Sequence, residues 1–220
     1  MERFMAKPRA KGATDAVGPG RWGYRIYHII ERPSPRGRRY EIQTPEKELV
    51  ALCRIRKKSE AVSFFADPKE SQEILRFHPK AVRQYASAFE VVDAPSGRPL
   101  GEFRKKVYPP LGKSEWFIFN PDGDPVGMVT ESAPDSWVGR LLSMGQSRPR
   151  SFELHWGQAV GGRISRRRVL LGLDHTQVDL TLDKKAVIDR RLALGLAVLV
   201  RDDETNGERT VAPAAQAKTV

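Results

Sequence analysis

The chain has 220 residues, a formal net charge of +11 and 40% hydrophobic residues. That length favours one domain with tails, and the composition is that of a soluble globular protein with a sizeable core. The lone cysteine, Cys53, excludes an internal disulfide and a zinc site built from several cysteines. Because no segment approaches the roughly 20 consecutive apolar residues that a membrane-spanning helix needs, we expect a basic cytoplasmic protein without a transmembrane span.

The N-terminal residues 1–39 form a basic arm, with ten Lys or Arg residues and three acids. A segment rich in Gly, Pro and Arg buries too little apolar surface to order itself fully, so we expect it to be largely flexible. Within it, residues 22–30 have the composition of an edge strand. A basic arm attracts polyanions, but it equally suits a solubilising tail, and the sequence leaves both interpretations open.

The middle of the chain repeats one pattern: an aromatic-led β-rich run, a turn of Asp, Asn, Pro or Gly, and a second β-rich run. It occurs at residues 40–54, 89–104 and 116–129, and it is typical of a β-hairpin. A degraded fourth copy spans residues 152–165, with its turn predicted at Gly161-Gly162.

Shorter patterns fill the remaining middle of the chain. Residues 169–173 predict a short buried strand, and residues 68–76 favour a turn or two of helix. Residues 178–182 alternate between apolar and polar side chains, which predicts that three of them face the interior: Val178, Leu180 and Leu182.

The C-terminal segment from Asp183 to Arg201 is rich in good helix formers, and Asp183 is a plausible N-cap. Residues 192–200 are apolar on every face, which indicates a helix that is wholly buried. Nine residues span only about 14 Å, roughly half of a bilayer core. We therefore expect a helix at about residues 185–200 inside a closed antiparallel β-barrel, because a filled lumen and hairpins without free edges satisfy both patterns. The polar residues 202–220 predict a disordered tail.

The hairpins Phe89 to Lys106 and Trp116 to Glu131, with the strand 178–182 and the apolar segment 192–200, resemble the tubby C-terminal-like superfamily in its LURF-one-related and phospholipid-scramblase-like branch. The likeness covers about residues 40–201 and implies a mainly β fold, a barrel of about twelve strands around a central C-terminal helix. For function it implies phosphoinositide binding, as in tubby-like members, or calcium-dependent lipid movement, as in scramblases.

Two departures from scramblases bear on that implied function. The acidic calcium segment expected before the final strand is reduced to Asp174-His175-Thr-Gln, and Cys53 stands alone where a cluster for palmitoylation is expected. Both departures argue against calcium dependence and stable lipid anchoring.

Motifs of catalysis and metal binding are absent from the sequence. The four histidines lack metal-ligand spacing, and no nucleophile elbow, phosphate-binding loop or dinucleotide-binding loop occurs. Cys53 lies in an apolar run and is interpreted as a core residue, and Asp189 beside Arg190-Arg191 as a structural ion pair. We expect no enzymatic activity, no cofactor and no metal.

Basic residues recur at the ends of the repeated hairpins, as Arg56-Lys57-Lys58 and Arg104-Lys105-Lys106, and again in the run 163–168. Equivalent hairpin positions belong on equivalent rims of a sheet, although Lys and Arg at strand ends also keep edges soluble. The candidate residues for an anionic ligand are Lys57, Lys58, Arg104, Lys105, Lys106, Arg163, Arg166, Arg167 and Arg168.

These patterns favour a non-enzymatic domain that binds anionic phospholipid headgroups at a membrane surface, because each base near such a surface adds about 1 kcal/mol of attraction. The alternative is a module of the same fold for non-specific nucleic-acid binding or protein interaction. An apolar ligand in the barrel is disfavoured because the helix fills that volume. We expect a monomer in the cytoplasm that associates at most peripherally with membranes.

Overall fold

A computed structural model of the chain describes residues 20–35, 37–56, 61–108, 113–132, 151–167 and 175–211, with side chains described except at residues 108, 113, 114, 167 and 204–211. The described residues form twelve β-strands and one long helix, α2 (Arg190–Val211). The strands are β1 (Ile26–Arg32), β2 (Arg38–Gln43), β3 (Leu49–Ile55), β4 (Val62–Phe65), β5 (Glu73–Lys80), β6 (Ser87–Asp93), β7 (Pro99–Tyr108), β8 (Lys113–Phe119), β9 (Pro125–Glu131), β10 (Ser151–Trp156), β11 (Ala159–Arg167) and β12 (His175–Asp179).

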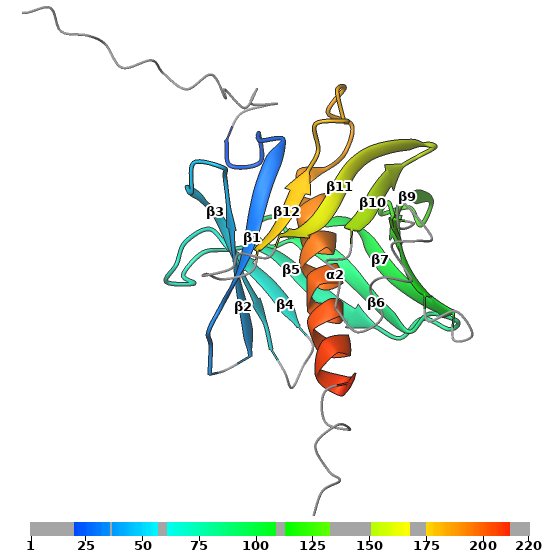
Figure 1. The fold of residues 1–220 in the computed structure, drawn as a ribbon, viewed down its shortest axis with the longest axis horizontal. Helices are drawn as coiled ribbons and strands as arrows, with labels where there is room; N and C mark the ends of the chain where they lie inside the picture. The colour runs from blue at the N-terminus through cyan, green and yellow to red at the C-terminus, as the bar shows by residue number, and fades with distance from the viewer. Residues whose placement is uncertain are drawn as a thin grey trace, which may run out of the picture.

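The twelve strands form a closed antiparallel barrel (Figure 1). Each strand pairs with its neighbours along the chain, and β1 closes the ring against β12 with Tyr27 opposite Val178 and Ile29 opposite Thr176. Closure leaves no sheet edge unpaired, which removes the usual template for aggregation of β-sheets. The predicted fold class is confirmed, and so are the three hairpins, which are β2–β3, β6–β7 and β8–β9.

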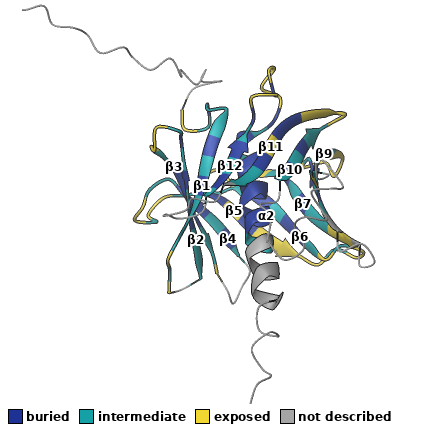
Figure 2. Ribbon diagram, in the orientation of Figure 1, coloured by how far each residue is buried: buried dark blue, intermediate teal, exposed yellow. Residues whose placement is uncertain are grey.

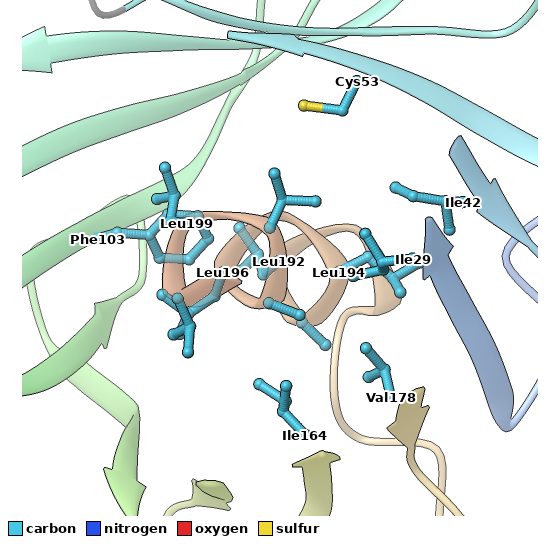
Figure 3. Close-up of a cluster of buried hydrophobic side chains, with 14 of the residues drawn as sticks. Ile29, Ile42, Cys53, Phe103, Ile164, Val178, Leu192, Leu194, Leu196 and Leu199 are labelled. Atoms are coloured by element: carbon cyan, nitrogen blue, oxygen red, sulfur yellow. The ribbon is translucent and has the colours of Figure 1, made fainter. Parts of the chain in front are cut away.

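Helix α2 runs through the middle of the barrel (Figure 1), and its apolar residues fill the lumen. Leu194 and Leu196 are fully buried. Figure 3 shows side chains of the barrel wall, among them Ile29 and Phe103, surrounding this part of the helix. The expectation of a buried helix is confirmed, because residues that are apolar on every face lie against strands on every side.

The barrel has two ends of different construction, which we call the entry end and the exit end. At the entry end α2 begins, and there the tight connections β2–β3, β4–β5, β6–β7, β8–β9 and β10–β11 lie. At the exit end α2 leaves the barrel, and β3, β7 and β11 terminate. Figure 2 shows exposed residues gathered in the connections and buried residues along the strands and the upper part of α2.

The barrel begins earlier in the chain than the predicted boundary at residue 40. The segment predicted as a flexible arm contributes β1 and the start of β2, and β1 is paired on both sides rather than being an edge strand. Tyr27 and Ile29 alternate inward and are fully buried, so this short apolar run outweighs the basic composition around it. Residues 1–19 lie outside the described residues.

Helix α2 begins later and ends later than predicted, at Arg190 and Val211 instead of about 185 and 200. Asp189, not Asp183, caps it, because the Asp189 carboxylate accepts a hydrogen bond from the N–H of Arg191 at 2.9 Å. The helix therefore continues into the predicted tail, of which residues 212–220 lie outside the described part.

Three smaller predictions were wrong. No helical turn forms at residues 68–76, because the Asp67 carboxylate holds a non-helical turn through the N–H groups of Lys69 and Gln72 before β5 begins. Leu182 is 54% exposed, since it follows the end of β12. Gly161-Gly162 lies within β11 rather than at a turn.

The glycine pair in β11 admits close packing against the barrel interior. A Cβ atom at Gly161 would lie 2.3 Å from Ile188 Cδ1, and one at Gly162 would lie 2.6 Å from Leu180 Cδ2. The predicted strand at residues 169–173 falls outside the described residues.

Candidate functional site

Charge is distributed unequally between the two ends of the barrel. The described strand ends and connections near the exit end carry the bases Arg32, Arg38, Arg39, Arg54, Arg56, Lys80, Arg83, Lys105, Lys106, Lys113, Arg166 and Arg167. The acids there are Glu31, Glu115, Glu131 and Glu153, and the helix adds the acids Asp202 and Asp203 and the base Arg201.

The entry end has the opposite balance of charge. Its bases are Arg21, Arg25, Lys47, Lys69, Arg98, Lys184, Lys185, Arg190 and Arg191. Its acids are Glu41, Glu46, Glu48, Asp67, Glu70, Glu73, Asp93, Asp122, Asp124, Asp179, Asp183 and Asp189. The basic excess of the barrel is thus concentrated where α2 leaves it.

The barrel topology explains why the bases gather at the exit end. Strands β3, β7 and β11 run in the same direction because each is two strands, or a multiple of two, from the others in an antiparallel sheet. Arg56 directly follows β3, and Lys106 lies near the end of β7. The expectation that the basic ends of the repeated hairpins share a rim is confirmed for these two residues.

Four exposed bases at the ends of alternate strands make up the candidate site, which we call the basic rim: Arg56, Lys80, Arg83 and Lys106. They come from the end of β3, the end of β5, the β5–β6 connection and the end of β7, a continuous part of the barrel wall. Lys80 forms an ion pair with Glu102 at 3.1 Å and is still 42% exposed. The rim therefore presents several cations to solvent side by side.

The predicted triplet at residues 104–106 does not share one surface. Successive strand residues point to opposite faces, and only Lys106 belongs to the exposed rim. Arg104 faces outward but is occupied: its guanidinium lies 4.0 Å from the centre of the Phe119 ring and 2.8 Å from Glu102 Oε1. Burial raises the pKa of Glu102, but hydrogen bonds from Arg104 and Lys80 outweigh it and hold that pKa below its ordinary value.

Lys105 faces the barrel interior at the exit end. Its Nζ lies 2.9 Å from Asp203 Oδ2 of α2 and 5.9 Å from the centre of the Trp116 ring. Trp116 Nε1 donates to the same carboxylate at 3.2 Å. Burial raises the pKa of Asp203 despite these two partners. Because its ammonium group is bound to Asp203 of α2, Lys105 attaches the helix to the barrel wall.

The basic run on β11 is divided in the same way. Arg163 faces outward, is 57% exposed and lies 3.7 Å from Glu153. Arg166 is half-buried and shares the inward face of Ile164, two residues before it. Lys57, Lys58 and Arg168 lie outside the described residues, as does the side chain of Arg167.

A ring of polar contacts, the exit collar, fixes α2 where it leaves the barrel. Arg38 Nη1 donates to Asp202 Oδ1 at 2.6 Å, and the Tyr40 hydroxyl donates to the same atom at 3.1 Å. Burial raises the pKa of Tyr40 far above its ordinary value, so this hydroxyl stays a donor at every physiological pH. With Lys105 and Asp203 on the opposite wall, the collar ties the helix to two sides of the barrel.

Ion pairs hold Arg191, in the first turn of α2, at the entry end. Arg191 Nη2 lies 2.7 Å from Asp189 and Arg191 Nη1 lies 3.4 Å from Asp93, which confirms the predicted structural ion pair. Cys53 is a core residue, as predicted: it is fully buried, and burial raises the pKa of its thiol, which keeps it protonated.

Sequence reasoning missed Lys80 and Arg83 as members of the rim. Both lie in the stretch between two predicted hairpins, where no repeated motif drew attention to them. Only the strand order could have identified these two residues. In an antiparallel barrel the β5–β6 connection must lie at the same end as the ends of β3 and β7.

No helix among the described residues has the length and apolar character needed to cross a membrane. No group of three or more His, Cys, Asp or Glu side chains among them is arranged to hold a metal ion.

Comparison of the chain with protein-family models, with curated proteins and with solved structures found no match in any of the three.

Proposed function

We propose that this protein is a non-enzymatic binding domain whose basic rim contacts anionic phospholipid headgroups at a membrane surface. The observation that carries the proposal is the concentration of exposed cations at one end of a barrel whose lumen is filled by its own helix. A filled lumen leaves the outside of the barrel as the place for a ligand. The resemblance to the tubby-like and scramblase-like families supports the same class of ligand.

The magnitude of the attraction suits reversible peripheral binding. Each Lys or Arg near an anionic membrane contributes about 1 kcal/mol, and the attraction fades within a Debye length. Four rim residues therefore give an affinity that ionic strength controls. Two further predicted residues, Lys57 and Lys58, follow Arg56 directly in sequence.

The test compares two triple variants with the same loss of charge. In the rim variant, Arg56, Arg83 and Lys106 are each replaced by Gln, and in the control variant the exposed entry-end residues Lys47, Lys69 and Arg98 are replaced in the same way. Sedimentation with vesicles of neutral or anionic lipid measures binding across a salt series. We expect the rim variant to bind anionic vesicles about a hundredfold more weakly, and the control variant to retain most of the affinity.

Two outcomes contradict the proposal. Equal losses in both triple variants mean that only net charge matters and that the rim has no special role. Stronger binding to random duplex DNA than to vesicles of the same charge density favours the nucleic-acid alternative, for which each lost phosphate contact lowers the log–log salt slope by about 0.9.

A further inference from the structure

Exposed aliphatic side chains gather on the β12–α2 loop, residues 180–189, at the entry end. Leu182 is 54% exposed and Val187 is 59% exposed, the two highest values among the large hydrophobic residues that the structure describes. Lys184 and Lys185 lie between them and are also exposed. Figure 2 shows this loop rising above the top of the barrel with most of its length exposed.

The loop is held rigidly by a buried carboxylate at its centre. Asp183 accepts hydrogen bonds from the N–H groups of Val187 at 3.0 Å and Ile188 at 3.1 Å, and Arg190 Nη1 donates to it at 2.6 Å. The Asp183 side chain is 2% exposed. Its three bonds turn the loop back on itself, so Leu182 and Val187 point outward although the core lies directly below.

The acids of the loop are all engaged by neighbouring groups. Asp183 pairs with Arg190, Asp189 pairs with Arg191, and Asp179 accepts a hydrogen bond from the hydroxyl of Thr181 at 2.6 Å. The other charged side chains of the loop are Lys184 and Lys185, whereas Asp179, at the end of β12, keeps its negative charge. A tip with aliphatic side chains on both sides of two ammonium groups matches the boundary between lipid headgroups and acyl chains.

The adjoining connection extends this surface without adding charge. The β10–β11 turn, residues 157–158, carries no ionisable side chain, and Val160 just beyond it is 36% exposed. Gly161 places that hairpin directly against Ile188 of the loop, with room for no side chain between them. The apolar tip is thus a patch from two neighbouring connections rather than one isolated residue.

We propose that the β12–α2 loop inserts Leu182 and Val187 into the interface of a lipid bilayer, with Lys184 and Lys185 at the headgroup phosphates. The loop lies at the opposite end of the barrel from the basic rim, so the two contacts are physically separate. They also differ in salt dependence, because burial of aliphatic groups persists at 1 M salt, where the Debye length is about 3 Å.

The double variant Leu182→Ser with Val187→Ser tests the loop on vesicles of mixed neutral and anionic lipid. We expect the wild type to retain salt-resistant binding to vesicles at 1 M salt. At that salt concentration the affinity of the double variant should be about tenfold lower. The rim variant loses binding at low salt and keeps the salt-resistant component. The two proposals therefore fail independently.

Insertion itself is measured with a fluorophore sensitive to polarity, attached to Leu182→Cys or, as a control at the exit end, to the exposed position Gln84→Cys. The buried thiol of Cys53 does not compete for the label. At 1 M salt, where the basic rim no longer holds the protein at the membrane, we expect a blue shift on vesicles at residue 182 and none at residue 84. No salt-resistant binding by the wild type, or a fluorophore at residue 182 that stays in water on vesicles, overturns the proposal.

Discussion

At the scale of single residues, Gly195 marks a close approach of α2 to the barrel wall. A Cβ atom there would lie 2.4 Å from Phe77 Cζ. Phe77 has no free space to retreat into, because its ring lies 5.2 Å from that of Phe64 and 5.6 Å from that of Phe103, measured between ring centres. Gly at this position therefore sets the distance between helix and wall.

Replacement of Gly195 by Ala tests this contact against helix propensity. Ala favours an isolated helix by about 1 kcal/mol over Gly, yet we expect Gly195→Ala to lower the free energy of unfolding by about 1–3 kcal/mol through overpacking. Chemical denaturation measures the change. The second substitution Phe77→Leu should recover part of the loss in the Gly195→Ala background, and a stabilised single variant would contradict the argument.

Asp183 is the residue on which the entry end depends most. Burial raises the pKa of Asp183, but the bonds from Arg190 and from the N–H groups of Ile188 and Val187 outweigh it, so that pKa lies below its ordinary value. An acid with a lowered pKa in the folded state stabilises the fold above its unfolded pKa, near 4, and loses that contribution as the pH falls through the folded value.

We therefore expect Asp183→Asn to lower the free energy of unfolding by about 3 kcal/mol at pH 7, since Arg190 is left buried without its counter-ion. The difference from the wild type should begin to shrink near pH 4, where the unfolded chain takes up the proton, and should shrink further as the pH falls through the lower pKa of the folded state. Denaturation curves from pH 3 to pH 7 measure both effects. Asp122→Asn, in the exposed β8–β9 turn, is the control, and an Asp183→Asn variant as stable as this control at pH 7 would refute the role.

At the scale of elements, the sequence predicts α2 because its apolar residues cover every face. Leu192 to Val200 offered no polar stripe, and only a fully enclosed helix satisfies such a pattern in water. Both predicted ends of α2 were wrong, and each error has a physical cause. Asp183 satisfies backbone N–H groups as an N-cap does, but it caps a loop, and the exit collar holds helical structure in a segment whose composition is polar.

Leu196→Asp tests whether the buried helix is essential to the fold. Leu196 is fully buried, and an unpaired charge there costs several kcal/mol, comparable to the entire stability of a domain. We expect no cooperative thermal transition in circular dichroism. Val187→Asp places the same charge at an exposed aliphatic residue and should melt close to the wild type. A Leu196→Asp protein that melts cooperatively would mean that the helix is peripheral.

The strands were predictable where the turn chemistry was explicit. The tripeptide Pro121-Asp122-Gly123 predicts the β8–β9 turn. Strand β1 was not predicted as part of the barrel, because the basic composition of residues 1–39 as a whole outweighed the pattern of its seven residues. Of the candidate site, the sequence predicts the rim through the repeated hairpin ends, but the inward direction of Lys105 depends on the phase of β7, which only the register against β8 reveals.

At the scale of the whole molecule, barrel and helix form one core cluster, so we expect them to unfold together. Native-state hydrogen exchange should give the amides of residues 192–200 the same free energy of opening as those of Val91, Phe103 and Leu154 in the barrel wall. The loops at both ends should exchange faster. Lower free energies confined to the helix would indicate that the barrel persists without it.

The position of the helix in the chain also constrains how the protein is made. All twelve strands leave the ribosome before the helix that fills their lumen. Strand β1 lacks its second partner until β12 has been synthesised. At 5–20 residues per second, the concave apolar face and two sheet edges stay open for many seconds during synthesis. We therefore expect the nascent sheet to expose the kind of apolar surface that chaperones bind, and the barrel to close when its central helix is added last.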